Sequence, residues 1–201
     1  MDMSAATIIL AITVIVSAIG LSSPRFIEQT VLRPYAIARG SRYETLVTSG
    51  FVHASIAHLA LNLITFYSFA YLLERRIGTL QFVILYFAGM LLSAAITCIK
   101  RRNDPNYAAL GASGAILAVL FAAIVYYPTQ RLFILPIPIP IPAPLFALCY
   151  LGFSYFASDR GAGQTVWGRT NHDAHIAGAL TGVLFVLLTN PGQFRALLDA
   201  I

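Results

Sequence analysis

One serine lies between glycines at the predicted start of an apolar helix, in the stretch from Tyr107 to Ala118. A helix that begins near Ser113 leaves its first backbone N–H groups unpaired and carries a partial positive charge at that end, which suits an oxyanion. Gly111 and Gly114 let the backbone turn tightly and let another helix or a substrate carbonyl come close. Ser113 is therefore a candidate nucleophile. Alone the pattern is weak evidence for a nucleophile, because serine and small residues also line ordinary contacts between membrane helices.

A histidine in the first turns of the last apolar stretch is the candidate base. His175 is followed by Gly178 and Gly182, whose Gly-x-x-x-Gly spacing predicts a face on which another helix packs closely. Gly178 comes three residues after His175, so the histidine lies on that same face. An imidazole held within about 3 Å of a serine hydroxyl on a neighbouring helix can take its proton.

Two polar neighbours of His175 receive other roles. Asp173 is two residues away, which corresponds to about 200° of helix rotation. It is therefore predicted to cap the helix N-terminus rather than to orient the imidazole. His172 is assigned to the preceding loop, as a solvated residue. This leaves Ser113 and His175 as the pair predicted to react.

The second predicted helix carries His58 and Asn62 in its first half. Their spacing of four residues places both side chains on one face, and polar groups inside a membrane are costly unless they face a cavity or partners. We interpret them as donors to an oxyanion. The alternative is a pair that forms hydrogen bonds between helices. His53, five residues earlier, is predicted to point elsewhere and to belong to the helix start.

The composition excludes a soluble protein. Of the 201 residues 58% are hydrophobic and only 10% are charged, and the mean hydropathy is +0.77, whereas soluble domains have an apolar share of about 45–50%. The net charge of +5 comes from basic residues that lie singly or in twos and threes beside apolar spans. This is typical of membrane flanks, so no nucleic-acid partner is expected. Cys98 and Cys149 fall inside apolar stretches, so neither a disulfide nor a metal site is expected.

Six apolar stretches predict an all-α polytopic membrane protein, folded as a single membrane domain over residues 1–201. The first run is interpreted as a transmembrane helix rather than a signal peptide, because no basic residue precedes it and no convincing cleavage site follows. The segment from Ser22 to Val52 is expected to be irregular and to lie at the membrane interface. The alternating prolines from Leu135 to Pro144 are expected to be extended. The predicted helices span residues 5–21, 54–77, 80–99, 113–127, 145–157 and 173–189.

If six helices alternate in direction, the second, fourth and sixth all begin on the same side of the membrane. Ser113, His175 and the polar pair of the second helix then lie at similar depth, which favours catalysis over unrelated packing roles. In this hypothesis Ser113 attacks a carbonyl, and His175 accepts its proton and later protonates the leaving amine. The Ser113 N–H and the polar pair hold the oxyanion. The alternatives are a non-catalytic membrane chaperone and a transporter, although the sequence lacks the internal repeat typical of transporters.

Three short stretches resemble the signature motifs of the rhomboid intramembrane serine proteases. They are Gly111-Ala-Ser-Gly114, Ala174-His-Ile-Ala-Gly178 followed by Gly182, and His53-x4-His58-x3-Asn62. The resemblance extends over nearly the whole chain. It implies a six-transmembrane-helix bundle, a Ser113 and His175 dyad without a carboxylate, oxyanion roles for the polar pair, and no cofactor. It also implies transmembrane proteins of the lipid bilayer as substrates.

The chain departs from the resemblance in two places. Glu44 and Thr45 stand where many members carry Trp-Arg in the first loop, and Leu117 stands where many carry an aromatic residue. Neither departure removes a catalytic group.

The resemblance also places both termini in the cytoplasm and the dyad toward the outside. We expect a multi-pass protein of the plasma membrane of a bacterium. The distribution of lysine and arginine points the other way, because more of these 13 residues fall in the supposedly outer loops than in the inner ones. We give precedence to the resemblance, since the first loop is expected to fold as a unit.

Overall fold

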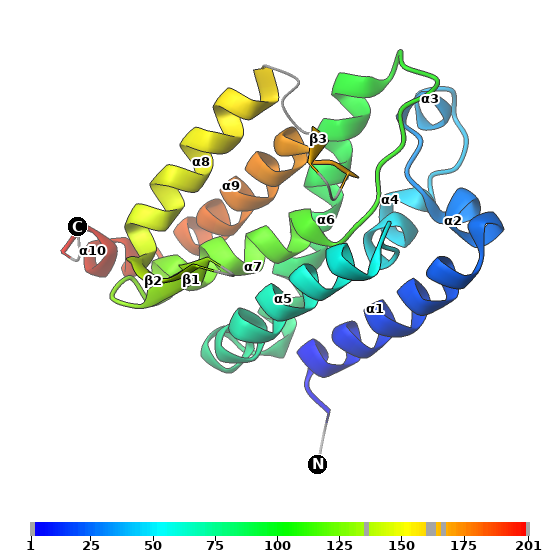
Figure 1. The fold of residues 1–201 in the computed structure, drawn as a ribbon. Helices are drawn as coiled ribbons and strands as arrows, with labels where there is room; N and C mark the ends of the chain where they lie inside the picture. The colour runs from blue at the N-terminus through cyan, green and yellow to red at the C-terminus, as the bar shows by residue number, and fades with distance from the viewer. Residues whose placement is uncertain (1–2, 135–136, 160–163, 166–167, 200–201) are drawn as a thin grey trace.

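The structure, a computed structural model, describes residues 3–134, 137–159, 164–165 and 168–199, and it is mostly helical (Figure 1). The long helices are α1 (Ala5–Ser22), α5 (Ile56–Ile77), α6 (Thr79–Arg101), α7 (Ser113–Tyr126), α8 (Ala143–Asp159) and α9 (His172–Thr189). The short helical elements are α2 (Pro24–Thr30), α3 (Pro34–Ile37), α4 (Thr45–Thr48), the 3-10 turn η1 (Ser49–Phe51) and α10 (Gln193–Leu198). The strands are β1 (Arg131–Ile134), β2 (Ile137–Pro142), β3 (Gln164–Thr165) and β4 (Gly168–Arg169).

The bounds of the six long helices differ from the predicted ones by at most two residues. Four of them, α1, α5, α6 and α9, are long and apolar enough to cross a membrane. Helices α7 and α8 are also apolar, but they are shorter, with 14 and 17 residues. The described part of the chain therefore has four candidate membrane spans, and the predicted count of six is not confirmed.

Helix α7 forms the centre of the bundle, where it packs against α5, α6 and α9 (Figure 1). Every residue from Gly114 to Tyr126 is buried, as expected for a helix that is apolar on all sides. Its 14 residues span about 21 Å, less than the roughly 30 Å of bilayer hydrocarbon. Because protein rather than lipid surrounds α7, its length need not match the bilayer. Its first residue, Ser113, can thus lie below the membrane surface.

Small residues set the distance between α7 and its neighbours. A Cβ atom on Gly178 would overlap the carbonyl oxygen of Gly114, and one on Gly182 would overlap the carbonyl oxygen of Ala118. On α6, Gly89 faces the side chain of Ala118 in the same way. The Gly-x-x-x-Gly face of α9 therefore meets the backbone of α7 directly, with no side chain between them.

The segment between α1 and α5 is more regular than predicted, because α2, α3, α4 and η1 replace the expected irregular loop. Helices α2 and α3 each begin with a proline, Pro24 and Pro34, which suits a first position where an N–H would have no acceptor. Arg33 donates two hydrogen bonds of 2.9 and 2.7 Å to the Glu28 carboxylate. These bonds hold the pKa of Glu28 below its usual value.

Backbone hydrogen bonds attach this segment to the stretch that precedes Ser113. Leu32 and Ala109 exchange bonds of 2.9 and 3.0 Å, and the Gly111 N–H donates to the Ser49 carbonyl at 2.9 Å. The first loop thus fixes the backbone that leads into α7.

A buried carboxylate holds the start of α1. The two oxygens of Glu74, near the end of α5, accept hydrogen bonds of 2.9 Å from the backbone N–H groups of Ala5 and Ala6. Thr79, at the start of α6, donates a third bond of 2.9 Å. The negative charge lies at the positive end of the α1 dipole, where it is stabilising.

The proline-rich stretch is extended over Ile137–Pro142, as predicted, and it is also paired, whereas Ala143 and Pro144 already belong to α8. Strand β2 runs antiparallel to β1 from Pro142 opposite Arg131 to Ile137 opposite Ile134, while residues 135 and 136 lie outside the described residues. Proline has no N–H to donate. The isoleucines between the prolines therefore supply the donors of β2.

Candidate functional site

The structure brings together the two residues predicted to react. The His175 Nε2 atom lies 2.9 Å from the Ser113 Oγ atom. Ser113 is the first residue of α7 and His175 lies in the first turn of α9, and these two helices pack along their glycine face. A hydroxyl within hydrogen-bond reach of an imidazole is the arrangement of an activated nucleophile.

Tyr150 on α8 contacts the other nitrogen of the imidazole. Its hydroxyl lies 2.8 Å from the His175 Nδ1 atom, and the two rings are stacked at 23° with centroids 6.4 Å apart. In the tautomer with its proton on Nδ1, His175 donates to the Tyr150 oxygen and keeps its Nε2 lone pair for the Ser113 hydroxyl. Sequence reasoning missed Tyr150, because a tyrosine in an apolar helix is most simply interpreted as a core residue. The only feature of the sequence that indicated a polar role was the hydroxyl group of this tyrosine.

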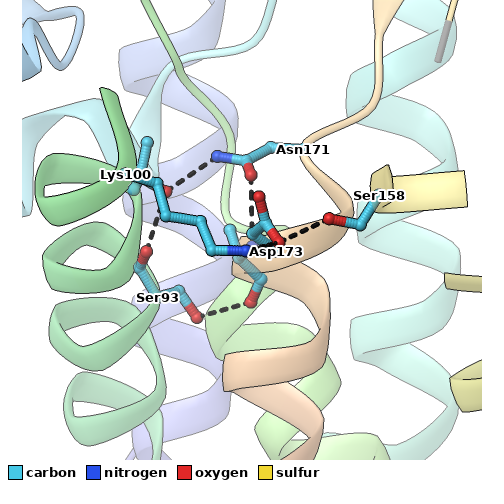
Figure 2. Close-up of polar contacts among 7 residues, drawn as sticks. Ser93, Lys100, Ser158, Asn171 and Asp173 are labelled. Carbon is cyan, nitrogen blue, oxygen red and sulfur yellow. Dashed lines mark hydrogen bonds and ion pairs between the residues drawn. The ribbon is translucent and has the colours of Figure 1, made fainter. Parts of the chain in front are cut away.

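Asp173 does not contact His175, nor does it cap α9 as predicted. Its Oδ1 atom accepts hydrogen bonds of 2.5 Å from both Lys100 and Ser158 (Figure 2). These partners belong to α6 and α8, so the carboxylate joins the ends of three helices. The predicted cap role is wrong because Asp173 is the second residue of α9, two positions after the N-cap.

The cap of α9 is Asn171. Its Oδ1 accepts from the Ala174 N–H at 3.1 Å, and its Nδ2 donates to Thr97 on α6 at 2.8 Å (Figure 2). Ser93, one turn earlier on α6, donates to the Ala174 carbonyl at 2.9 Å. The turn that carries His175 is therefore held against α6 by hydrogen bonds from both directions.

His172 is the first residue of α9 and is buried, not solvated as predicted. Its ring contacts Phe153 of α8 and His175, with centroids 5.6 and 6.1 Å away. The burial comes from α8 packing over the start of α9. No local sequence pattern reports this contact.

His58 and Asn62 lie on the face of α5 that is turned toward the stretch before Ser113. The His58 ring packs against the backbone of Gly111, where a Cβ atom would lie only 2.7 Å from the ring. The Gly111 φ of +111° independently favours glycine at this position. The Asn62 side chain is buried, and its Nδ2 donates to the His58 carbonyl at 2.9 Å. Because an amide nitrogen carries two N–H groups, one donor of Asn62 is left for another acceptor. Within the described residues, neither side chain forms a hydrogen bond to Ser113.

His53 is fully buried beside His58, with ring centroids 4.9 Å apart, so the prediction that it points elsewhere is wrong. Its Nε2 accepts a long hydrogen bond of 3.5 Å from the Ala112 N–H, and its Nδ1 lies 2.8 Å from the Ser17 hydroxyl of α1. Burial lowers the pKa of His53 to about 3, with a smaller effect from His58. His53 is therefore a neutral link between α1 and the residue before Ser113.

A small cavity of about 60 Å³ lies beside Ser113. Its polar lining comes from Ser49, Ser93, Thr97 and Asn171. The volume accommodates at least one water molecule, and the lining offers it several partners. Among the described residues there is no group of three histidine, cysteine, aspartate or glutamate side chains that could hold a metal ion.

A family described as the rhomboid domain matches residues 40–191 of the chain. The chain is also similar to curated proteins of three kingdoms. It is 28% identical over 165 residues to the human presenilin-associated rhomboid-like protein, mitochondrial, with 80% of this chain and 42% of that protein aligned. It is 24% identical over 189 residues to RHOMBOID-like protein 12, mitochondrial, of Arabidopsis thaliana, with 85% of this chain and 54% of that protein aligned. It is 27% identical over 170 residues to Rhomboid protein 1, mitochondrial, of Saccharomyces cerevisiae, with 80% of this chain and 45% of that protein aligned.

These names correct one expectation. The plasma membrane of a bacterium is wrong as the location, because the matching relatives are mitochondrial proteins of eukaryotes, and they point to a mitochondrial membrane instead. An integral, multi-pass membrane protein agrees with the four candidate spans. The chain covers about half the length of these relatives or less.

Proposed function

Since the chain belongs to the rhomboid family, whose members are generally intramembrane serine proteases, we propose that it hydrolyses peptide bonds of membrane proteins with a Ser113 and His175 dyad. The observation that carries the proposal is the 2.9 Å contact between the Ser113 hydroxyl and the His175 Nε2 atom at the start of a buried helix. All six long helices belong to the proposed membrane bundle, with α7 shielded from lipid at its centre.

The reaction proceeds in two stages. Ser113 Oγ attacks the substrate carbonyl carbon as its proton passes to His175 Nε2, and the tetrahedral intermediate collapses when the imidazolium gives that proton to the leaving amine. A water molecule then enters, His175 removes one of its protons, and the hydroxide attacks the acyl-serine ester. Collapse of the second intermediate releases the carboxylic acid and returns the proton to Ser113.

The negative oxygen of each intermediate needs donors that are in place beforehand. The Ser113 N–H lies at the start of α7, where the first N–H groups of a helix lack intrahelical acceptors and the dipole favours negative charge. His58, against Gly111, and Asn62, with its second N–H, supply the side-chain donors. Tyr150 acts as a positioning residue that holds the His175 tautomer.

The proposed substrates are transmembrane proteins. The carbonyls of a substrate helix are already hydrogen-bonded within that helix, so the helix must partly unwind before Ser113 can attack. We therefore expect cleavage near the membrane boundary, at a small residue with a helix breaker nearby. The glycines on either side of Ser113 leave little room for a large side chain beside the scissile bond. Replacing a glycine by leucine in the substrate helix should slow cleavage.

A fluorophosphonate probe tests the dyad directly, because it reacts with an activated serine and needs no known substrate. The folded protein should be labelled at Ser113, and Ser113→Ala and His175→Ala should abolish both labelling and proteolysis. Ser68→Ala is the matched control, because the Ser68 hydroxyl only donates to its own helix, to the Ile64 carbonyl at 2.8 Å. Labelling that survives Ser113→Ala would refute the assignment.

A further inference from the structure

A groove of about 560 Å³ lies between α5, α7, α8 and the β1–β2 hairpin. Its walls include Leu61 and Ile64 of α5, Ile124 of α7 and Phe146 of α8. The volume falls within the range of small-molecule sites, roughly 300–1,000 Å³. Helices α5 and α8 each contact α7, so α7 forms the floor between them (Figure 1).

The groove is apolar and opens on the outside of the helix bundle. Two hydroxyl groups border it, but Thr65 and Ser68 each donate to the carbonyl four residues earlier in α5, at 2.9 and 2.8 Å. Its rim is formed by hydrophobic side chains that are exposed, with 47% of Ile64 and 61% of Phe133 accessible. The ligand that suits these walls is a hydrocarbon chain that enters from the side.

The lining of the groove includes one positively charged side chain. Arg131, the first residue of β1, borders it with an exposed side chain, and no acidic residue lines it. Within the described part of the chain, Arg131 forms no ion pair. Its neighbour Gln130 adds a side-chain amide at the same edge. An apolar slot with an unpaired guanidinium at its border is complementary to a molecule with an apolar chain and an anionic head.

The groove is separate from the dyad. It borders the second half of α7, from Leu120 onward, whereas Ser113 is the first residue of that helix. Ten residues along a helix, as from Ser113 to Ala123, correspond to about 15 Å.

We propose that this groove is a binding site for an anionic phospholipid. One acyl chain lies between α5 and α8 on the floor formed by α7, and the phosphate pairs with the Arg131 guanidinium. The glycerol and ester groups lie at the border formed by Gln130 and β1. Phospholipids without net charge enter the same slot more weakly, because their phosphate is already neutralised by its own headgroup cation.

The test compares two lipid probes in the intact protein. The full chain is reconstituted in nanodiscs of phosphatidylcholine that contain a trace of either phosphatidylglycerol or phosphatidylcholine, each with the same photoreactive acyl chain. After illumination, mass spectrometry locates the labelled peptides. The phosphatidylglycerol probe should label the peptides containing Ile64 and Phe146 at least about fivefold more than the phosphatidylcholine probe, since one arginine near a surface contributes on the order of 1 kcal/mol to anionic-lipid binding.

Two matched pairs of variants identify the site. Arg131→Gln should reduce phosphatidylglycerol labelling of the groove to the phosphatidylcholine level, whereas Arg195→Gln, which removes an arginine outside the groove, should leave it unchanged. Ile64→Trp should fill the groove and reduce labelling by both probes. Ile84→Trp, at an exposed position on α6 away from the groove, should not.

The readout is independent of proteolysis, so it does not depend on the proposed dyad. The proposal is overturned if the two probes label the groove equally, or if Arg131→Gln and Arg195→Gln reduce labelling to the same extent. An uncharged transmembrane peptide that displaces the lipid probe as well as unlabelled phosphatidylglycerol does would assign the groove to a protein helix instead.

Discussion

Gly178 on α9 faces the carbonyl oxygen of Gly114 on α7 with no space for a Cβ atom between them. Gly114 directly follows Ser113, and Gly178 lies about one turn after His175. The contact between these two backbones therefore sets how close the hydroxyl and the imidazole come, which is 2.9 Å. Backbone atoms yield less than the ends of flexible side chains, so the separation is well defined.

Gly178→Ala should move α9 away from α7 and reduce turnover by at least about tenfold, with a loss of about 1–3 kcal/mol in stability, as for an overpacked core. The measurements are the rate of fluorophosphonate labelling per folded molecule and thermal unfolding in detergent. Gly152→Ala is the control, because an added methyl group there meets no atom within 4 Å. Equal effects of the two substitutions would show that the glycine contact does not determine the distance between Ser113 and His175.

Tyr150→Phe keeps the ring stacked on His175 but removes the hydroxyl at 2.8 Å from Nδ1. The buried Nδ1–H then lacks its acceptor, and we expect kcat to fall roughly tenfold with little change in KM. The pH profile of kcat should also shift, because the protonated imidazole loses a partner. Tyr155→Phe, on the exposed face of α8, is the control. An unchanged pH profile and rate would remove Tyr150 from the site.

Asp173→Asn should keep turnover within about threefold of the parent protein, because the carboxylate bonds to Lys100 and Ser158 and not to His175. Stability should fall by less than about 1 kcal/mol, since the Lys100 side chain is 55% exposed to solvent. Lys100→Met combined with Asp173→Asn should cost little more than either change alone. A thousandfold loss of turnover in Asp173→Asn would instead make the site a triad.

Asn62→Ala and His58→Ala should each lower turnover by roughly 10- to 1,000-fold, the range for a lost oxyanion donor, with a smaller effect on substrate binding. Thr65→Ala is the control on the same helix, because its hydroxyl serves only the Leu61 carbonyl. Circular dichroism in detergent should show both low-activity variants folded. Unfolding of both, with no folded form of low activity, would favour a purely structural role.

The stability of the protein should depend on pH through His53. Its pKa is about 3 in the folded protein, against 6.5 for an ordinary solvated histidine, so below pH 6.5 the unfolded chain binds a proton that the folded protein does not. This lowers the free energy of unfolding by up to about 1.4 kcal/mol per pH unit between pH 6.5 and 3. His53→Asn should be less stable at pH 7, and the stability difference should shrink as the pH falls. A difference that stays constant from pH 7 to 4 would contradict the assignment of His53 as a buried neutral residue.

The helices and the proximity of Ser113 and His175 could be predicted because their signals are local. Apolar runs of sufficient length predict helices, and the spacing of His175 and Gly178 defines a face without knowledge of the partner helix. The position of Tyr150 could not be predicted, since its contact with His175 depends on how α8 packs on α9. The same packing buries His172.

Other errors arose where tertiary contacts override local patterns. The short helices α2 and α3 are too short to be stable alone. They are fixed by contacts such as the Arg33 and Glu28 pair and the bridge from Leu32 to Ala109. The prolines of β2 forbid a helix, but pairing with β1 depends on the isoleucines between them.

The Glu74 carboxylate has a consequence for the order of assembly. The N–H groups of Ala5 and Ala6 donate to the Glu74 side chain, which is synthesised about 70 residues later, with sequence separations of 69 and 68. Until α5 has been inserted beside α1, these donors lack the acceptor that they have in the folded protein, and unpaired backbone groups are costly away from water. The start of α1 is thus completed only by the end of α5. Insertion of α1 and its docking are separate events in biogenesis, and the second waits for the turn between α5 and α6.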